Sequence, residues 1–360
     1  MLVSEPHLGL RVLSCLASPK RAITVVGGED ATHLRFSRYC RRFEPLPESL
    51  FHPNSALDAV KALTDICRRE GAELIVPAGM DATFLLARIR ESLPCASFPL
   101  SAPAILEELH DKWSFQKLAA EFAFPHPRTG LLSTEDTPVP EGFDFPFLAK
   151  ARDRSGGRGV SLVQTQKELD TFLLDARAND RLPIIIQEYV SGLDGSIGIL
   201  ANHGEIVAHS SQLYRADGAG ADFAPLPDAL ESLRSLVAGR RLHGIFQFDL
   251  RVDPESGRYW VTECNPRFWA SVLLSLCDGA DFVNWGIDRA GHAHDSATAS
   301  DKGSVVKTGR GETCIWPRAL LSGIAKHPGN ARQASRASRN LLRFTASDLL
   351  PYIFGYRSPS

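Results

Sequence analysis

The sequence lacks an excess of charge of either sign, paired cysteine motifs and long apolar runs. Its 40 Lys and Arg residues against 42 Asp and Glu give a formal net charge of −2, which gives no reason to expect nucleic acid as a main partner. None of the seven cysteines stands in C-x-x-C spacing, which favours reduced thiols in a cytoplasmic protein. No apolar run approaches the roughly 18–20 residues that a membrane span needs. The apolar segment at 10–17 has no basic region before it and contains Arg11, so we expect a buried helix there rather than a signal peptide.

Two common phosphate-binding signatures are also missing. The glycine-rich segment Ser155-Gly156-Gly157-Arg158-Gly159 fits neither G-x-G-x-x-G nor the Walker pattern, and it connects two predicted strands rather than a strand and a helix. It can still form a hairpin loop whose backbone N–H groups approach phosphates, because glycine permits close contact and positive φ. Lys150 enters this loop as a positive charge within reach of phosphate oxygens. A plain glycine hairpin explains these residues equally well.

The most informative residues present are Glu263-Cys264-Asn265-Pro266-Arg267, which follow a predicted strand at 259–262. A second predicted strand, 246–252, carries Asp249, and the turn-rich loop between the two strands has hairpin length. Side chains alternate along a strand, so one face is expected to hold Tyr259, Val261, Glu263 and Asn265. Asp249 joins that face only if paired residue numbers sum to an even value, as when Asp249 lies opposite Val261. We predict this even register.

Gathering two carboxylates on one face needs a compensating charge. At about 4 Å and an effective dielectric constant near 20, a pair of like charges costs roughly 4 kcal/mol. A hard cation between them reverses the sign. The oxygen set of Asp249, Glu263 and Asn265 suits Mg²⁺, whose coordination is usually completed by water and substrate phosphates. The alternative is a solvated hairpin whose acids face water.

The first hundred residues alternate predicted strands and helices, which indicates a parallel sheet with helices on both faces. Strands are expected at 22–26 and 74–76, and a helix is expected to start at Asn54-Ser55 and stop at Gly71. Its apolar face is predicted to comprise Leu57, Val60, Leu63 and Ile66. The loops at Gly27 and Gly79 lie where ligands bind to such sheets, although ordinary turn glycines explain each one alone.

The ordered motifs of the chain resemble those of the ATP-grasp superfamily, in particular its carboxylate–amine ligase branch. The resemblance covers roughly residues 1–290. It implies an α/β protein with an N-terminal pre-ATP-grasp parallel-sheet domain followed by a two-lobed α+β ATP-grasp fold. The landmarks, in order, are Asp111-Lys112-Trp113, Leu148-Ala149-Lys150 with Ser155–Gly159, Gln187-Glu188-Tyr189-Val190 with Gly192-Leu193-Asp194, Phe248-Asp249, and Glu263–Arg267.

The resemblance also implies domain boundaries. We expect a Rossmann-like domain at 1–110 and an ATP-grasp domain at 111–300 with a flexible lid at about 128–188. A basic helical tail is expected at 301–360, where ten Lys and Arg residues stand against three Asp and Glu. Four arginines of the tail fall on one helical face, which favours a solvated or intersubunit surface. They are Arg332, Arg336, Arg339 and Arg343.

By position, the resemblance assigns a role to each landmark residue. Lys112 and Lys150 resemble the phosphate-contacting lysines, and the loop with Ser155, Gly156, Gly157 and Gly159 resembles the lid over the triphosphate. The strand with Gln187, Glu188 and Val190 resembles the one that reads adenine through backbone groups, and Asp194 resembles the ribose-binding acid. The resemblance implies that Asp249, Glu263 and Asn265 hold one or two Mg²⁺ ions, or Mn²⁺. Arg267 and Lys150 resemble catalytic residues at the transferred phosphate. Each has a simpler structural alternative, such as a solvated Lys112 or an Arg267 that merely pairs with Glu263.

The function implied is an ATP- and Mg²⁺-dependent ligase that joins a carboxylate to an amine through an acyl-phosphate and releases ADP and phosphate. Its partners would be small-molecule acids and amines, and homodimers are common in this superfamily. The alternatives are a small-molecule kinase on the same fold and a non-catalytic nucleotide-binding protein. The sequence gives no diagnostic pattern for the substrates; Arg215 is one guess for a carboxylate anchor.

Overall fold

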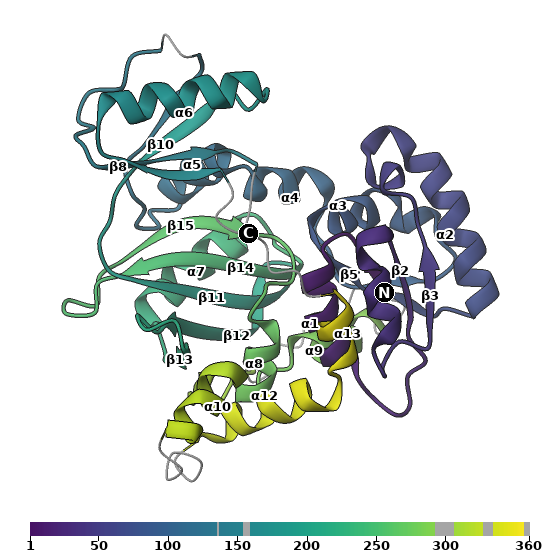
Figure 1. Ribbon diagram of the computed structural model, residues 1–360. Coiled ribbons are helices and arrows are strands. Elements are labelled where there is room, and N and C mark those ends of the chain that lie inside the picture. Colours follow the sequence, from purple (N-terminus) through teal and green to yellow (C-terminus); the bar gives the residue numbers. More distant parts are fainter. Residues whose placement is uncertain (135–136, 154–158, 292–305, 327–333, 356–360) are drawn as a thin grey trace.

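The computed structural model describes residues 1–134, 137–153, 159–291, 306–326 and 334–355. The N-terminal region folds around a four-stranded parallel sheet with the strand order β3-β2-β1-β5 (Figure 1). The strands are β1 (Leu2–Val3), β2 (Thr24–Gly27), β3 (Arg42–Pro45) and β5 (Pro77–Ala78), and the helices are α1 (Pro6–Leu16), α2 (Ala56–Glu70), α3 (Met80–Ile89) and α4 (Pro103–His110). A two-stranded parallel sheet of β4 (Leu74–Ile75) and β6 (Ala96–Ser97) lies beside it. The predicted parallel sheet is therefore confirmed.

Helix α2 shows where the apolar pattern was interpreted correctly and where it was not. The helix ends at Gly71, whose φ of 61° is the left-handed conformation that glycine adopts without strain. Leu63 is buried as predicted, but Leu57 is 87% exposed. The prediction for Leu57 was wrong because the buried face follows Ala59, Leu63 and Cys67, one turn apart, and Leu57 points away from it.

A second, antiparallel sheet with the order β7-β10-β8-β9 forms a small separate lobe at the upper left of Figure 1. Its elements are β7 (Thr129–Leu132), β8 (Phe147–Ala151), β9 (Val160–Val163), α6 (Gln166–Ala178) and β10 (Ile184–Glu188). It has its own apolar cluster, in which Phe147 and Ile186 of the sheet pack against Leu169 of the helix. This lobe corresponds to the segment expected to form a lid.

The largest sheet has six strands in the order β15-β14-β11-β12-β13-β16. Its elements are β11 (Leu193–Asn202), β12 (Glu205–Tyr214), β13 (Gly220–Phe223), α7 (Pro227–Gly239), β14 (Gly244–Val252), β15 (Tyr259–Asn265), α8 (Val272–Asp278), α9 (Phe282–Gly291) and β16 (Thr313–Ile315). Two apolar clusters each combine residues of this sheet with residues of the N-terminal region. The parallel and six-stranded sheets therefore share a continuous core, unlike the small lobe.

The C-terminal segment does more than form helices. Besides α10 (Pro317–Lys326), α12 (Arg336–Ser347) and α13 (Leu350–Gly355), it supplies the edge strand β16, which the sequence analysis did not predict. The Asp348 carboxylate accepts hydrogen bonds from Ser37 Oγ (2.5 Å) and Arg38 N (2.9 Å), so the segment also binds the N-terminal region. On α12, Arg336, Arg339 and Arg343 are exposed, and Arg332 lies outside the described residues. The domain boundaries stay a prediction.

Candidate functional site

Strands β14 and β15 pair in the predicted even register at the carboxylates. Asp249 lies opposite Glu263, and Gln247 lies opposite Asn265. The example pairing of Asp249 with Val261 was wrong, because Glu263 itself is the cross-strand neighbour. Directly opposite residues point to the same face of a sheet, so the two carboxylates share one face.

A β-bulge produces this arrangement. Beyond Asp249 the register shifts and Leu250 pairs with Val261, which leaves Thr262 as the extra residue on β15. Val261 is fully buried in the core, whereas Glu263 points to the opposite face. The prediction that Tyr259 and Val261 share a face with Glu263 and Asn265 was therefore wrong. Strict alternation fails across a bulge.

Two hydrogen bonds of Thr262 hold the bulge. Thr262 Oγ1 donates to the Asp249 carbonyl oxygen at 3.2 Å. The Thr262 carbonyl oxygen accepts a hydrogen bond at 2.9 Å from Nε2 of Gln116, a buried residue of α5 (Lys112–Glu121). Gln116 is a positioning residue that sequence reasoning missed, because nothing in its local pattern indicates a contact with a strand so distant in sequence.

The two carboxylates have different electrostatic environments. Burial, the charge of Glu263 and a hydrogen bond shared with Glu263 raise the pKa of Asp249 well above its usual value. Burial also opposes ionisation of Glu263, but the nearby Lys112 and Lys150 outweigh it and lower the pKa of this group. The Lys112 Nζ atom lies 3.3 Å from Glu263 Oε2, and Asn265 Nδ2 donates to Asp249 Oδ2 at 2.9 Å. The pair can therefore share a proton that a divalent cation would replace.

Lys150 enters the same region from the small lobe. It lies on β8, is 7% exposed, and its Nζ donates to Gln187 Oε1 at 2.6 Å. Gln187 is fully buried, and its Nε2 donates in turn to Thr129 Oγ1 at 3.0 Å. Burial lowers the pKa of Lys150 to about 8, against the opposing effect of Glu263. The side chain of Gln187 therefore positions Lys150.

The predicted adenine-reading segment leaves strand β10 at its end. Glu188 is exposed, and the N–H of Val190 donates to no partner among the described residues. The Val190 carbonyl oxygen instead accepts from Arg251 Nε at 3.2 Å. Arg251 Nη1 also donates to Asp194 Oδ1 at 2.5 Å, and the Asp194 side chain is 70% exposed. Of the predicted glycine loop, Ser155, Gly156 and Gly157 lie outside the described residues, whereas Gly159 has a positive φ of 70° next to β9.

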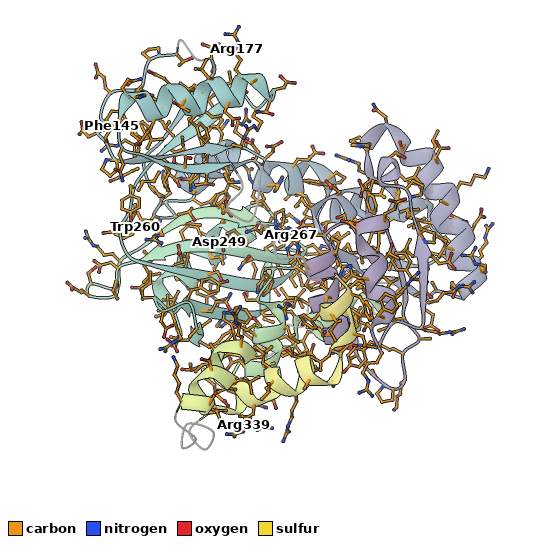
Figure 2. The ribbon with its side chains drawn as sticks, viewed as in Figure 1. Phe145, Arg177, Asp249, Trp260, Arg267 and Arg339 are labelled. Carbon is orange, nitrogen blue, oxygen red and sulfur yellow. The ribbon has the colours of Figure 1, made fainter. Side chains whose placement is uncertain are left out.

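Arg267 connects this site to the N-terminal region. Its guanidinium Nε lies 3.3 Å from Glu5 Oε1, and both side chains are largely buried. The same Glu5 oxygen accepts a hydrogen bond at 2.8 Å from the backbone N–H of Met80, at the start of α3. The alternative in which Arg267 pairs with Glu263 is thus not realised. Figure 2 shows Arg267 between Asp249 and the N-terminal helices.

The carboxylate row continues sideways across the sheet. Asp249 lies opposite Ser196, and Ser196 lies opposite Gln212. Both residues are buried, and Gln212 Nε2 donates to Ser196 Oγ at 2.8 Å and to Tyr214 OH at 3.0 Å. Arg215, guessed as a carboxylate anchor, is instead paired with Asp217 (3.1 Å) and Asp222 (3.6 Å). Uncharged polar groups therefore adjoin the carboxylates on this side.

The donor set fits a magnesium ion. Two carboxylates and one amide converge from β14 and β15, and all three can present oxygen ligands. Among the described residues, no cluster of three or more His, Cys, Asp or Glu side chains is arranged to hold a metal. Water and phosphate oxygens would therefore complete the coordination. In the described part of the chain, every helix is too short or too polar to cross a membrane.

Solved structures of other proteins share the fold of this chain. No family model matches the chain. The biotin carboxylase domain of 2-oxoglutarate carboxylase from Hydrogenobacter thermophilus, whose structure contains MgADP, superposes with a TM-score of 0.63 at 18% identity, covering 81% of this chain and 69% of that one. L-amino acid ligase from Bacillus licheniformis gives a TM-score of 0.62 at 16% identity, covering 80% and 73%. The chain has the ATP-grasp fold. The fold class predicted from sequence is thereby confirmed.

A curated relative of this ATP-grasp chain is also similar in sequence. The arginine-specific large chain of carbamoyl phosphate synthase from Halalkalibacterium halodurans is 21% identical over 200 residues, which cover 51% of this chain and 19% of the relative. The chain thus matches only about a fifth of the length of that relative.

Proposed function

We propose that this ATP-grasp protein is an ATP- and Mg²⁺-dependent ligase that joins a carboxylate to an amine through an acyl-phosphate and releases ADP and phosphate. One observation carries the proposal. Asp249 and Glu263 lie side by side on one face of the sheet, with Lys112 beside Glu263. Lys150 and Arg267 supply further positive charge to the same region. This set suits phosphoryl transfer, which needs positioning and charge neutralisation more than a nucleophilic side chain.

The chemistry explains why activation is needed. An amine cannot displace oxide from a carboxylate at neutral pH, but it can displace phosphate from an acyl-phosphate. MgATP would supply the phosphoryl group. In the proposed roles, Lys112 and Lys150 bind phosphate oxygens, while Asp249, Glu263 and Asn265 hold the metal. Arg267, kept in place by Glu5, would stabilise the charge on the group being transferred.

The remaining contacts of the nucleotide are assigned by the same proposal. The carbonyl oxygen of Glu188 and the N–H of Val190 would read the adenine edge, and the absence of a described partner for this N–H supports that role. Asp194 would bind the ribose hydroxyls. The lobe at about 128–188, with the loop that ends at Gly159, would form the lid over the phosphates. Residues 1–110 would form the wall of the substrate site.

The test is a screen for phosphate release over pairs of amino acids offered as acid and amine. We expect ADP and phosphate to form only when both partners are present, with Glu263→Ala as the inactive blank. Glu255→Ala, at an exposed carboxylate in the hairpin loop, is the matched control and should retain activity. Release of AMP and pyrophosphate would refute the acyl-phosphate route. ADP formation without an amine would indicate a kinase, and ATP binding without turnover would indicate a non-catalytic binding protein.

A further inference from the structure

A cavity of about 370 Å³ opens at the carboxyl-terminal edge of the parallel sheet. Ser4 follows β1, Gly28 follows β2, and Asp81 lies in the first turn of α3, and all three line the cavity. Ligands of parallel α/β sheets bind at this edge. The cavity also adjoins the candidate active site, because Ser4 precedes Glu5, the partner of Arg267.

The walls of the cavity carry negative charge that the protein does not compensate. Asp30, Glu48 and Asp81 all line it, and in the chain as described none of these carboxylates has an ion-pair partner within 4.0 Å. The one lysine or arginine in the lining, Arg88, is paired with Glu107 at 2.7 Å. The cavity therefore presents an anionic surface to any ligand.

Two of these acids converge on one point above Gly28. A Cβ atom placed on Gly28 would lie 3.0 Å from Glu48 Cγ and 3.2 Å from Asp30 Oδ1. Glycine at this position therefore keeps open the space between the two carboxylates. The half-buried rings of Phe51 and Phe84 line the same cavity. Carboxylates beside aromatic rings suit a cation on an apolar stem.

We propose that this cavity binds the cationic end, an ammonium or guanidinium group, of one substrate of the enzyme. Asp30 and Glu48 contact the cation from either side of Gly28, and Asp81 adds a third negative charge. The reacting end of the substrate extends past Ser4 towards Arg267. The volume lies within the usual range of small-molecule sites, about 300–1,000 Å³. That the bound cation is a substrate rests on the proposed ligase function, but its binding does not.

The test compares three ligands with the same five-carbon stem: cadaverine, pentanediol and glutarate. Titration calorimetry on the full chain should show cadaverine binding at least tenfold more tightly than the other two. Asp30→Asn and Glu48→Gln should each weaken cadaverine about tenfold or more, since a hydrogen bond to a charged group has this strength. Gly28→Ala should weaken it without any change of charge. Asp65→Asn, at an exposed carboxylate of α2 outside the cavity, is the matched control and should bind as the wild type does.

The proposal is overturned if cadaverine does not bind, if pentanediol binds equally well, or if the three cavity variants bind cadaverine normally. Thermal unfolding and ATP binding of each variant show whether it is folded. Failure of the ligase proposal can be distinguished from failure of the cation site. Cadaverine binding without ADP formation from any acid–amine pair would keep the cation site and refute the ligase. ADP formation from acid–amine pairs without cadaverine binding would keep the ligase and refute the cation site.

Discussion

The carboxylate site on the six-stranded sheet and the cavity of the N-terminal region differ in how their charged side chains are paired. At the carboxylate site on the six-stranded sheet, formed by Asp249 and Glu263, the half-buried Glu263 carboxylate lies 3.3 Å from the buried Lys112 ammonium, and the Lys150 ammonium is buried against the Gln187 amide. In the N-terminal cavity, Asp30, Glu48 and Asp81 are exposed and have no such partner among the described residues. Charged groups that the protein already pairs are held in place whichever substrate binds. Carboxylates without a partner favour a ligand of opposite charge and so discriminate between substrates. The carboxylate site would therefore perform chemistry common to all substrates, and the cavity would decide which substrate is used.

The largest effect on activity is expected when the Glu263 carboxylate, which faces Lys112, is neutralised. Glu263→Gln keeps the shape of the side chain but removes the charge that faces Lys112 and the proposed metal. Loss of such a stabilising group typically costs about 3–4 kcal/mol in the barrier, so kcat should fall roughly 10²–10³-fold for every substrate. Steady-state ADP release measures this, with Glu255→Gln as the control. A variant impaired only towards cationic substrates would contradict the division of roles between the carboxylate site and the cavity.

A smaller effect is expected from the residue that positions Lys150. Gln187→Leu keeps the bulk of the side chain but removes the acceptor at 2.6 Å from the buried ammonium. A hydrogen bond to a charged group contributes about 1.5–3 kcal/mol, so we expect ATP to bind roughly 10–100-fold more weakly. Titration calorimetry with ATP and magnesium tests this. Gln164→Leu, at an exposed position of the same lobe, should bind ATP normally; an equal loss there would mean that the lobe was disturbed generally.

The buried lysine should also give ATP binding a distinctive pH dependence. Burial lowers the pKa of Lys150 to about 8, so the free protein loses this positive charge as the pH rises through that value. ATP binds the charged form, and the Kd should therefore increase above about pH 8 and approach a tenfold change per pH unit. Lys150→Arg should abolish this rise, because arginine stays protonated throughout the range. A flat profile for the wild type would contradict the assignment of Lys150 to the phosphates.

The carboxylate site could be predicted from the sequence much better than the cavity. Asp249, Glu263 and Asn265 stand close together along one hairpin, so strand alternation and motif order were enough to bring them to one face. The bulge at Thr262 was not predictable, because it depends on the amide of Gln116 from a distant helix. The Arg267–Glu5 pair was missed for the same reason, since it joins the end of β15 to the loop after β1.

The cavity could be predicted from the sequence even less well. Its acids come from separate loops, and no spacing in the sequence relates Asp30, Glu48 and Asp81 to one another. The sequence did indicate the loops at Gly27 and Gly79, which lie at the same edge of the sheet as the cavity. It could not indicate the charge of the cavity wall, because the charge depends on which neighbouring side chains remain unpaired after folding.

The smallest effect, and the one that separates the two regions most cleanly, concerns stability without ligand. Glu263→Gln leaves Lys112 and Lys150 facing less negative charge in a buried site, so the melting temperature should fall. Asp30→Asn removes one of two like charges that converge over Gly28, and it breaks no ion pair among the described contacts. Its melting temperature should stay the same or rise slightly, because surface substitutions that remove no specific contact usually change stability by less than about 0.5 kcal/mol. Calorimetric melting of both variants at low salt checks this, and added salt should reduce the gain at Asp30 by screening the repulsion. If Asp30→Asn lowered the melting temperature as much as Glu263→Gln, the cavity acids would be structural, and the contrast between the carboxylate site and the cavity would disappear.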